Sequence, residues 1–280
     1  MIALHPGDAG YPLGLRDLRP TPDPLWLDGR EVLSGRTCVA IVGTRRMSPY
    51  GERVARELAA SLAMAGAVIV SGLAQGIDCA AHAGAIDAGG DSVAVLGEGI
   101  TSFLANASGR RRRLAVAIRA HGALVSAYAP VMPAQGWMFA KRNAVIAALA
   151  RVVIVAEAPA GSGALITADE ARRVGRPVFA VPGPLGARTS EGTNALIASG
   201  AARASRGADD VARAAGLEAT PHAGADDPVL EALAAGPLDL DELARRLGVG
   251  QRGLRARLVG LVLAGAVADQ GDGRYARAAR

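Results

Sequence analysis

Cysteine and histidine are scarce in this sequence. Its 280 residues contain two cysteines, Cys38 and Cys79, and four histidines. The two cysteines lie far apart, without the short spacing of metal ligands or of a disulfide framework. We therefore expect packed, reduced thiols, no metal site and no cofactor.

Long hydrophobic runs and targeting signals are also missing. No apolar run reaches the roughly 18 residues that a membrane span needs. The N-terminal stretch contains Pro6, Gly7, Asp8 and Pro12 and lacks the charged-then-apolar order of a signal peptide. Half of all residues are nevertheless hydrophobic, which argues against disorder and predicts a folded, cytoplasmic protein with no membrane span.

The excess of positive charge is small. Thirty-one basic side chains stand against 26 acidic ones, and this net charge of +5 does not by itself indicate a nucleic-acid partner. The distribution is more informative, because residues 226–280 carry eight acidic and eight basic side chains. The whole surplus therefore lies in residues 1–225, where we expect any affinity for phosphate.

Residues 37–215 alternate short β-branched runs with helix-length segments. The first repeat has a strand at Val39–Val42, a helix at Tyr50–Gly66 and a strand at Val68–Val70. Further strands are predicted at 93–96, 123–126, 152–156 and 178–181, and further helices at 77–88, 114–120, 142–150 and 165–174. The alternation predicts a Rossmann-like, doubly wound α/β domain with a mainly parallel sheet.

Three other segments flank that domain. Residues 1–36 are rich in proline, contain a short strand at Leu25–Leu27, and are expected to form an N-terminal extension that packs on the core. Residues 216–228 lack periodicity and are interpreted as a linker. Residues 229–280 combine three helical patterns with a glycine-tipped hairpin, which predicts a winged-helix domain.

Two turns follow the strands of the first repeat, at the carboxyl ends of adjacent strands. Such positions bind ligands in open α/β sheets, and glycines and free N–H groups at a helix start favour phosphate. Arg45 and Arg46 add fixed positive charge, although both could simply be solvated. Ser71 and Gln75 could bind a nucleic-acid backbone or close their own turn. The predicted anion site consists of Gly43, Thr44, Arg45, Arg46, Ser71, Gly72, Gln75 and Gly76.

The segment 137–143 combines aromatic and basic side chains. Aromatic residues make up 3% of the chain, yet Trp137 and Phe139 lie within a few positions of Lys141, the only lysine among 31 basic residues. Bases stack on such rings and phosphates pair with the cations, which suits single-stranded nucleic acid. Alternatively, the rings pack under the sheet and Lys141 extends over them. The candidate binding residues here are Trp137, Phe139, Lys141, Arg142 and Asn143, of which Asn143 could instead cap its helix.

Three further features give weaker signals. Ser162, between two glycines, and Thr167, one helical turn into the next segment, could line another phosphate-binding turn or serve fold packing. The run Arg110–Arg113 has no aromatic or glycine-rich neighbour and is interpreted as a solvated loop or helix start. Asp78 and His82 could be mistaken for a catalytic pair, but no nucleophile accompanies them. We therefore predict a structural contact between them and no catalytic residue.

Six motifs carry a family resemblance. They are Ile-Val-Gly-Thr-Arg at 41–45, Ser-Gly-Leu-Ala-Gln-Gly-Ile-Asp at 71–78 followed by His82, Lys-Arg-Asn at 141–143, Val-Ala-Glu-Ala-Pro-Ala-Gly-Ser-Gly-Ala-Leu-Ile-Thr at 155–167, Val-Pro-Gly at 181–183 and Gly-Thr-Asn-Ala-Leu-Ile at 192–197. In this order they resemble the DprA/Smf family of DNA-processing proteins, over roughly residues 11–280. Ala140 stands where the family usually has proline. Phe103–Asn106 and the run Arg110–Arg113 stand where it usually has Tyr-Pro-x-Asn.

The resemblance implies a bacterial homodimer that binds and protects single-stranded DNA, loads the recombinase RecA during natural transformation, and catalyses no reaction. Many members carry a further helical domain, which residues 1–36 are too short to hold. An alternative on a related fold is a nucleotide-processing enzyme of the phosphoribohydrolase type. Its Pro-Gly-Gly-x-Gly-Thr-x-x-Glu loop is matched poorly by residues 160–167, and Glu170 has the wrong spacing.

A third possibility concerns the predicted winged helix. Arg252, Arg255 and Arg257 lie on its predicted recognition helix, from which they could read duplex DNA. The balanced charge of residues 226–280 argues against strong independent binding and favours an auxiliary or protein-contact role.

Overall fold

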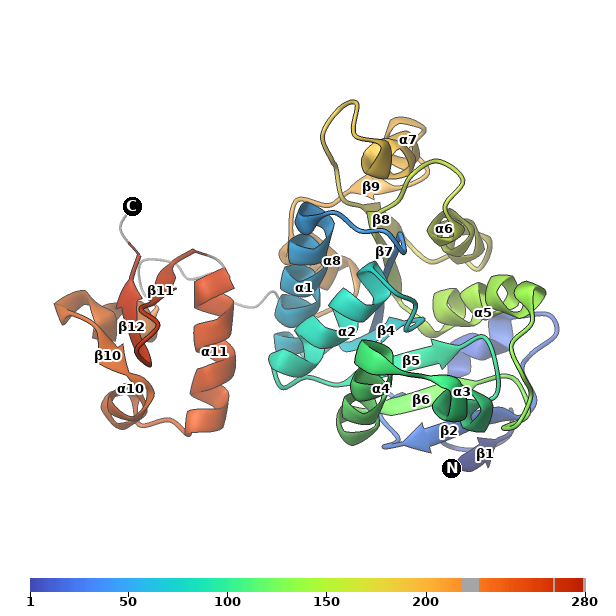
Figure 1. Cartoon of the computed structure of the whole chain (residues 1–280), viewed down its shortest axis with the longest axis horizontal. Coiled ribbons are helices and arrows are strands. Elements are labelled where there is room, and N and C mark those ends of the chain that lie inside the picture. The colour runs from blue at the N-terminus through green and yellow to red at the C-terminus, as the bar shows by residue number, and fades with distance from the viewer. Residues whose placement is uncertain (218–226, 264, 279–280) are drawn as a thin grey trace. The chain divides into compact units, whose positions relative to one another are not determined.

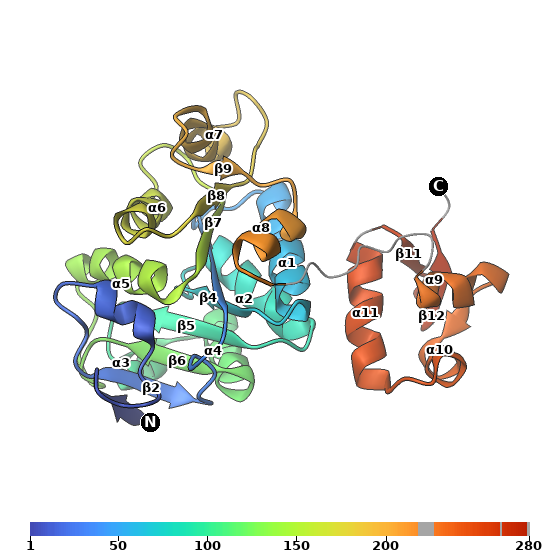
Figure 2. The ribbon, with the colours of Figure 1, turned by 180° about the vertical axis from the view of Figure 1, so that it is seen from behind.

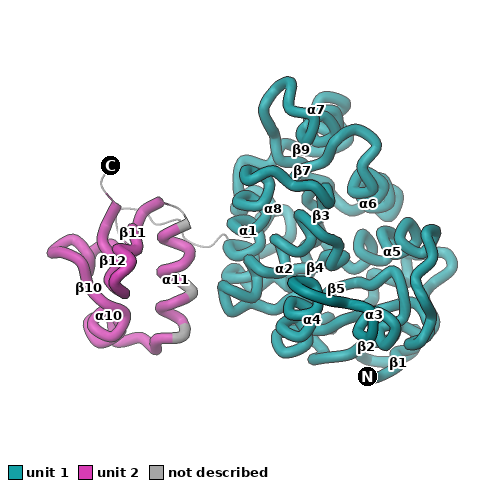
Figure 3. Tube along the Cα trace, in the orientation of Figure 1, with its two compact units in different colours: residues 1–218 teal, residues 219–280 magenta. Residues whose placement is uncertain are grey.

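The computed structural model describes residues 1–217, 227–263 and 265–278. The chain forms two compact units, residues 1–218 and 219–280 (Figure 3). The division falls inside the predicted linker, of which residues 218–226 lie outside the described residues. Within the described ranges, no helix is long and apolar enough to cross a membrane.

A nine-stranded sheet forms the centre of the larger unit (Figure 1). Its strands are β1 (Ile2–Leu4), β2 (Leu25–Gly29), β3 (Cys38–Gly43), β4 (Val68–Ser71), β5 (Ser92–Leu96), β6 (Ala123–Ser126), β7 (Val152–Glu157), β8 (Val178–Ala180) and β9 (Arg203–Ala204). Their order is β1-β2-β6-β5-β4-β3-β7-β8-β9, parallel from β6 to β9 and antiparallel at β1 and β2. The predicted Rossmann-like, mainly parallel sheet is confirmed.

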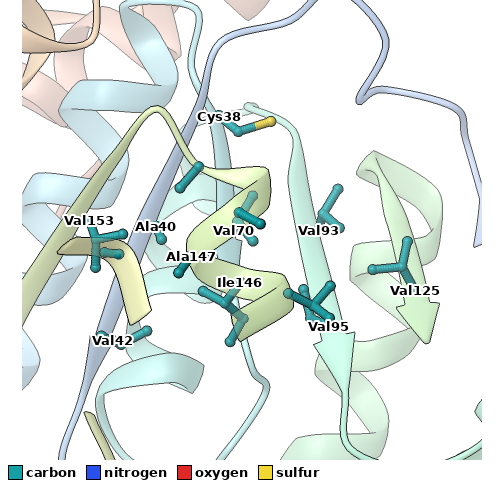
Figure 4. Packing of buried hydrophobic residues seen from close by; sticks show 14 of the residues in the cluster. Cys38, Ala40, Val42, Val70, Val93, Val95, Val125, Ile146, Ala147 and Val153 are labelled. Atoms are coloured by element: carbon teal, nitrogen blue, oxygen red, sulfur yellow. The ribbon is translucent and has the colours of Figure 1, made fainter. Parts of the chain in front are cut away.

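Helices cover both faces of this sheet. They are α1 (Pro49–Met64), α2 (Ile77–Asp87), α3 (Ile100–Asn106), α4 (Gly109–His121), α5 (Gly136–Leu149), α6 (Gly163–Arg173), α7 (Glu191–Ala198) and α8 (Ala208–Ala214). Successive side chains of a β-strand point to opposite faces of the sheet, so they pack in separate hydrophobic cores. Val39 and Ile41 pack with α1, α2 and α8, whereas Cys38, Ala40 and Val42 pack on the side of α5 and α6 (Figure 4).

The order of the strands creates a switch point between β3 and β7. From β3 the chain runs through β4 and β5 to β6, with α1 to α4 on one face. It then returns through α5 on the other face to β7, on the opposite side of β3. Connections that leave in opposite directions open a crevice at the carboxyl ends of such strands, which is where ligands bind.

Residues 1–36 extend the sheet as well as packing on its core. β2 pairs with β6 and β1 pairs with β2, at the edge seen from both sides in Figures 1 and 2. A 3₁₀ turn at Leu13–Asp17 buries Leu15 completely. The strand predicted at Leu25–Leu27 is confirmed. β1 was not predicted, because three residues offer too little periodicity to interpret.

The smaller unit is a winged helix, as predicted. It contains α9 (Pro228–Ala232), a 3₁₀ turn at Leu233–Ala235, α10 (Leu240–Leu247), α11 (Gln251–Leu263) and the strands β10 (Leu238–Asp239), β11 (Val267–Asp269) and β12 (Arg274–Arg277). The sheet order is β10-β12-β11. Leu243, Leu254 and Leu258 are buried in a separate core, and Asp239 caps α10 by accepting the Glu242 N–H at 2.8 Å.

Candidate nucleic-acid interface

A pocket of about 490 Å³ opens at the switch point between β3 and β7. The turn after β3, the first half of α5 and the start of α6 line it. Nine of the predicted binding residues belong to this lining: Gly43, Thr44, Arg45, Arg46, Phe139, Arg142, Asn143, Ser162 and Thr167. Six do not: Ser71, Gly72, Gln75, Gly76, Trp137 and Lys141.

The turn after β3 holds two exposed arginines at the pocket. The Thr44 N–H donates to the Glu157 carbonyl at 2.7 Å, and the Thr44 Oγ1 accepts the Arg46 N–H at 3.2 Å. The Arg45 guanidinium lies 5.9 Å from the centroid of the Phe139 ring, a cation–π contact between this turn and α5. Fixed backbone bonds therefore position the two cations where the sequence predicted an anion site.

Glu157 and Ser48 anchor the far end of this turn. The Glu157 carboxylate is buried at the end of β7 and accepts the Ser48 N–H at 2.8 Å and the Ser48 hydroxyl at 2.6 Å. The Ser48 Oγ in turn accepts the Gly51 N–H at 3.0 Å and so caps α1. This pair was not predicted from the sequence. The sequence feature that could have indicated it is a serine directly before a proline at a helix start.

The turn after β4 is built mainly for packing. Ser71 is fully buried and its hydroxyl donates to the Ile41 carbonyl at 2.6 Å. At Gly72 an added Cβ would come within 1.1 Å of the Arg142 Nη1, and Gly76 has a φ of +89° close to the Thr44 carbonyl. These residues shape the turn and do not face the pocket. Gln75 is exposed beside them.

α5 begins at Gly136, several residues before the predicted start at Arg142. The early start places 137–143 on a helix, so Asn143 cannot be its cap. Trp137 and Lys141 are one turn apart, and the Lys141 Nζ lies 4.8 Å from the Trp137 ring. Trp137 is 50% exposed and contacts the Tyr128 ring edge-on at 5.9 Å. The alternative that this ring packs under the sheet is therefore wrong, although Lys141 does extend over it.

Arg142 points inward and forms the floor of the pocket. Its side chain is 6% exposed, and its Nη1 lies 3.8 Å from the Asp78 Oδ2. Asp78 also accepts the N–H groups of Gly72 and Ala74 at 3.1 and 3.3 Å. Burial raises the pKa of Asp78, opposed by the Arg142 guanidinium and these N–H groups. The Arg142 Nε is buried without a hydrogen-bond partner among the described residues.

Asp78 and His82 do not form the structural contact that we predicted from their spacing. Asp78 turns to Arg142, whereas the His82 Nδ1 lies 2.7 Å from the Ser92 Oγ. The Ser92 hydroxyl donates to the Ile69 carbonyl at 2.9 Å, so the His82 Nδ1 carries the proton between them. Burial and then the Arg142 charge lower the pKa of His82 to about 3, which keeps the ring neutral.

The start of α6 closes the other side of the pocket. Ser162 caps this helix by accepting the Ala164 N–H at 3.4 Å, and Thr167 is buried one turn later. Asn143 Nδ2 donates to the Gly163 carbonyl at 3.2 Å and joins α5 to α6. The positive end of a helix dipole therefore faces the pocket together with the arginines. The lining also contains Ile166, which is 44% exposed and was not predicted.

This arrangement suits an anionic ligand with flat apolar parts. Two exposed arginines, one buried arginine and a helix N-terminus provide positive charge, and the rings of Phe139 and Trp137 provide stacking surfaces. In the described part of the chain, no three His, Cys, Asp or Glu side chains lie close enough to hold a metal ion.

Comparisons with known proteins agree with this geometry. The family described as DNA recombination-mediator protein A matches residues 3–216, and the DprA winged helix domain matches residues 212–273. Protein Smf of Escherichia coli is 40% identical over 200 residues, which cover 71% of this chain and 53% of that protein. The chain thus spans about half the length of this relative.

Solved structures are similar as well. DNA processing protein A from Streptococcus pneumoniae superposes with a TM-score of 0.69 at 36% identity, covering 76% of this chain and 73% of that one. DNA processing protein A from Helicobacter pylori, described for its single-stranded DNA binding mode, gives 0.66 at 29% identity and covers 72% and 91%. Since the family match spans most of the sequence and these relatives share its fold, the chain belongs to the DprA/Smf family of DNA-processing proteins.

Proposed function

We propose that this protein binds single-stranded DNA in the pocket between β3 and β7 and along the Trp137–Lys141 face of α5. The observation that carries the proposal is the convergence of Arg45, Arg46 and the buried Arg142 on one pocket bordered by the Phe139 ring. Cations bind the phosphates, while the rings stack bases that are free only in a single strand. The binding mode described for the Helicobacter pylori relative supports this reading.

The biological role that we propose is recombination mediation without catalysis. Membership in a recombination-mediator family supports protection of incoming strands and the loading of RecA in the cytoplasm during natural transformation. A homodimer would extend the DNA path from one pocket to the next. Light scattering tests the dimer. Restoration of RecA ATPase activity on strands covered by single-strand binding protein tests the loading.

The binding site is tested by titration of oligo-dT, followed by fluorescence anisotropy at low and physiological salt. Arg45→Ala and Lys141→Ala should each weaken binding without lowering the midpoint of thermal unfolding. Each lost phosphate contact should reduce the salt slope by about 0.7. Arg30→Ala is the matched control, because Arg30 contacts Asp91 and Gly122 at the amino ends of β5 and β6, opposite the pocket. Unchanged dissociation constants for both pocket variants would overturn the assignment.

Nucleotide hydrolysis is the competing function, and the pocket offers few side chains that could catalyse it. Glu170 is bound to Arg173 at 2.6 Å and does not line the pocket. Asp78, the acidic residue of the lining, is buried and already holds Arg142 and two backbone N–H groups. Incubation with AMP should therefore release no adenine. Turnover at a rate that follows protein concentration would overturn the proposal of a non-catalytic protein.

A further inference from the structure

The arginine run Arg110–Arg113 forms the first turn of α4, outside the pocket. All four side chains are exposed. The sequence alone indicated a solvated loop or helix start, and the structure places the run at a helix start.

These cations occupy the unfavourable end of the helix. The N-terminus of α4 carries no acidic residue in its first turn, and Ser108 makes no capping bond through its side chain. Positive charges here add to the positive end of the helix dipole, and like charges three positions apart repel. Within the described residues, the only ion pair of the run joins the Arg110 Nη2 to the Glu52 Oε1 at 3.3 Å. A polyanion at this turn would relieve the repulsion.

Two contacts connect the run to the turns of the DNA site. The Arg111 Nε donates to the Leu73 carbonyl at 3.1 Å, next to Ala74 in the pocket lining. Arg110 reaches Glu52 in the first turn of α1, which follows the Arg45–Arg46 turn. Gln75, which is exposed, directly follows Ala74 in the chain. The run and the pocket also act on the same group electrostatically. Burial lowers the pKa of Arg142 most, and the charges of Arg45 in the pocket and Arg111 in the run lower it further.

We propose that the bound single-stranded DNA leaves the pocket over Gln75 and that its sugar–phosphate backbone continues along Arg110, Arg111 and Arg113. This second phosphate track rests on the proposed single-stranded DNA binding. It would hold phosphates and not bases. The ring that Arg111 contacts, Phe103, is buried beneath its guanidinium at 5.1 Å and offers no stacking face. Binding along the track is therefore independent of sequence and sensitive to salt.

The test compares oligo-dT of two lengths, about six nucleotides for the pocket alone and about thirty for pocket and track. The variant is Arg110→Gln/Arg113→Gln, since Arg111 and Arg112 hold the Leu73 and Leu104 carbonyls and are left in place. We expect unchanged affinity for the short strand. For the long strand we expect weaker binding and a salt slope smaller by about 1.4, from two lost phosphate contacts.

Arg172→Gln/Arg173→Gln is the matched control, because it removes two exposed arginines from the end of α6, away from the pocket. It should change neither strand's affinity. A second variant, Arg113→Glu, should weaken long-strand binding and raise the midpoint of thermal unfolding, since an acid suits a helix start. A purely structural arginine would give the opposite change in midpoint.

The proposal is overturned if the double variant binds the long strand like the unmodified protein. Equal weakening of both strands, or an equal loss in the control, would also overturn it, because the effect would then be one of general charge. If the unmodified protein binds neither strand, the proposed function fails, and the track fails with it. Tight short-strand binding without any length effect would remove the track alone.

Discussion

Neighbouring basic residues in α5 have different roles. Lys141 is exposed and lies against Trp137, whereas Arg142 is buried against Asp78 and Gly72. Removing one partner of a buried pair leaves an uncompensated charge, so Arg142→Met should lower the free energy of unfolding by about 3 kcal/mol. Lys141→Met should change it by less than about 0.5 kcal/mol. Urea unfolding of both variants tests this, and equal losses would show that the Arg142–Asp78 pair is not the cause.

His82 should make stability depend on pH. Burial and the Arg142 charge lower its pKa from 6.5 to about 3 in the folded chain. Between these values the unfolded chain binds a proton that folded His82 does not. The contribution of neutral His82 to the free energy of unfolding is therefore fully present above about pH 6.5. It falls by about 1.4 kcal/mol per pH unit as the pH drops towards 3.

The substitution His82→Gln should remove this part of the profile. Urea unfolding between pH 7 and pH 4 is the measurement, with His121→Gln at the end of α4 as the control. The difference between the unmodified protein and His82→Gln should shrink as the pH falls. A difference independent of pH would mean that His82 titrates alike in both states.

Candidate binding side chains could be predicted where the indication lay in the local sequence. Lys141 stood out as the only lysine, and Trp137 and Phe139 as aromatics in a chain that has few. The burial of Arg142 was not predictable, because it depends on Asp78 and Gly72, which come together with it only through the packing of α5 on the turn after β4. The partner of the Ser71 hydroxyl was not predictable for the same reason, since it is the Ile41 carbonyl of another strand.

Among the elements, we expect the loop before α1 to couple stability to binding. Ser48 caps α1 and donates to the buried Glu157, so Ser48→Ala removes a cap and leaves a carboxylate oxygen without its donor. We expect a loss of about 1–3 kcal/mol in the free energy of unfolding. Since this loop follows Arg45 and Arg46, oligo-dT binding should also weaken, although no charge is changed. Stability loss with unchanged binding would show that the loop does not position the arginines.

Element types were predicted better than element limits. The strands from β3 to β8 were recognisable in the sequence as short β-branched runs, because buried parallel strands are apolar on both faces. The start of α5 was placed too late, since its first turn buries only Met138 and shows no apolar period. α7 was missed because it is short and only partly buried, and β9 because it has two residues, both exposed.

At the scale of the whole molecule, charge separates the two units. The net surplus of +5 belongs to residues 1–225, and the winged helix neutralises part of its own charge, for example through Arg257 and Asp227 at 3.2 Å. Each unit also has its own core, so neither needs the other to bury its apolar residues. This separation followed from the sequence, because it depends on composition and not on packing.

Residues 1–217 alone should therefore retain the binding of single strands. All the proposed contacts, from Arg45 to Lys141, lie in this part, and phosphate contacts determine the salt dependence. We expect the shortened chain to bind oligo-dT within about twofold of the full-length protein, with the same salt slope. Residues 227–280 alone should bind neither oligo-dT nor duplex tightly at physiological salt, because their charges balance. A smaller slope in the shortened chain would mean that arginines of the winged helix also contact the strand, and the phosphate path would then have to include them.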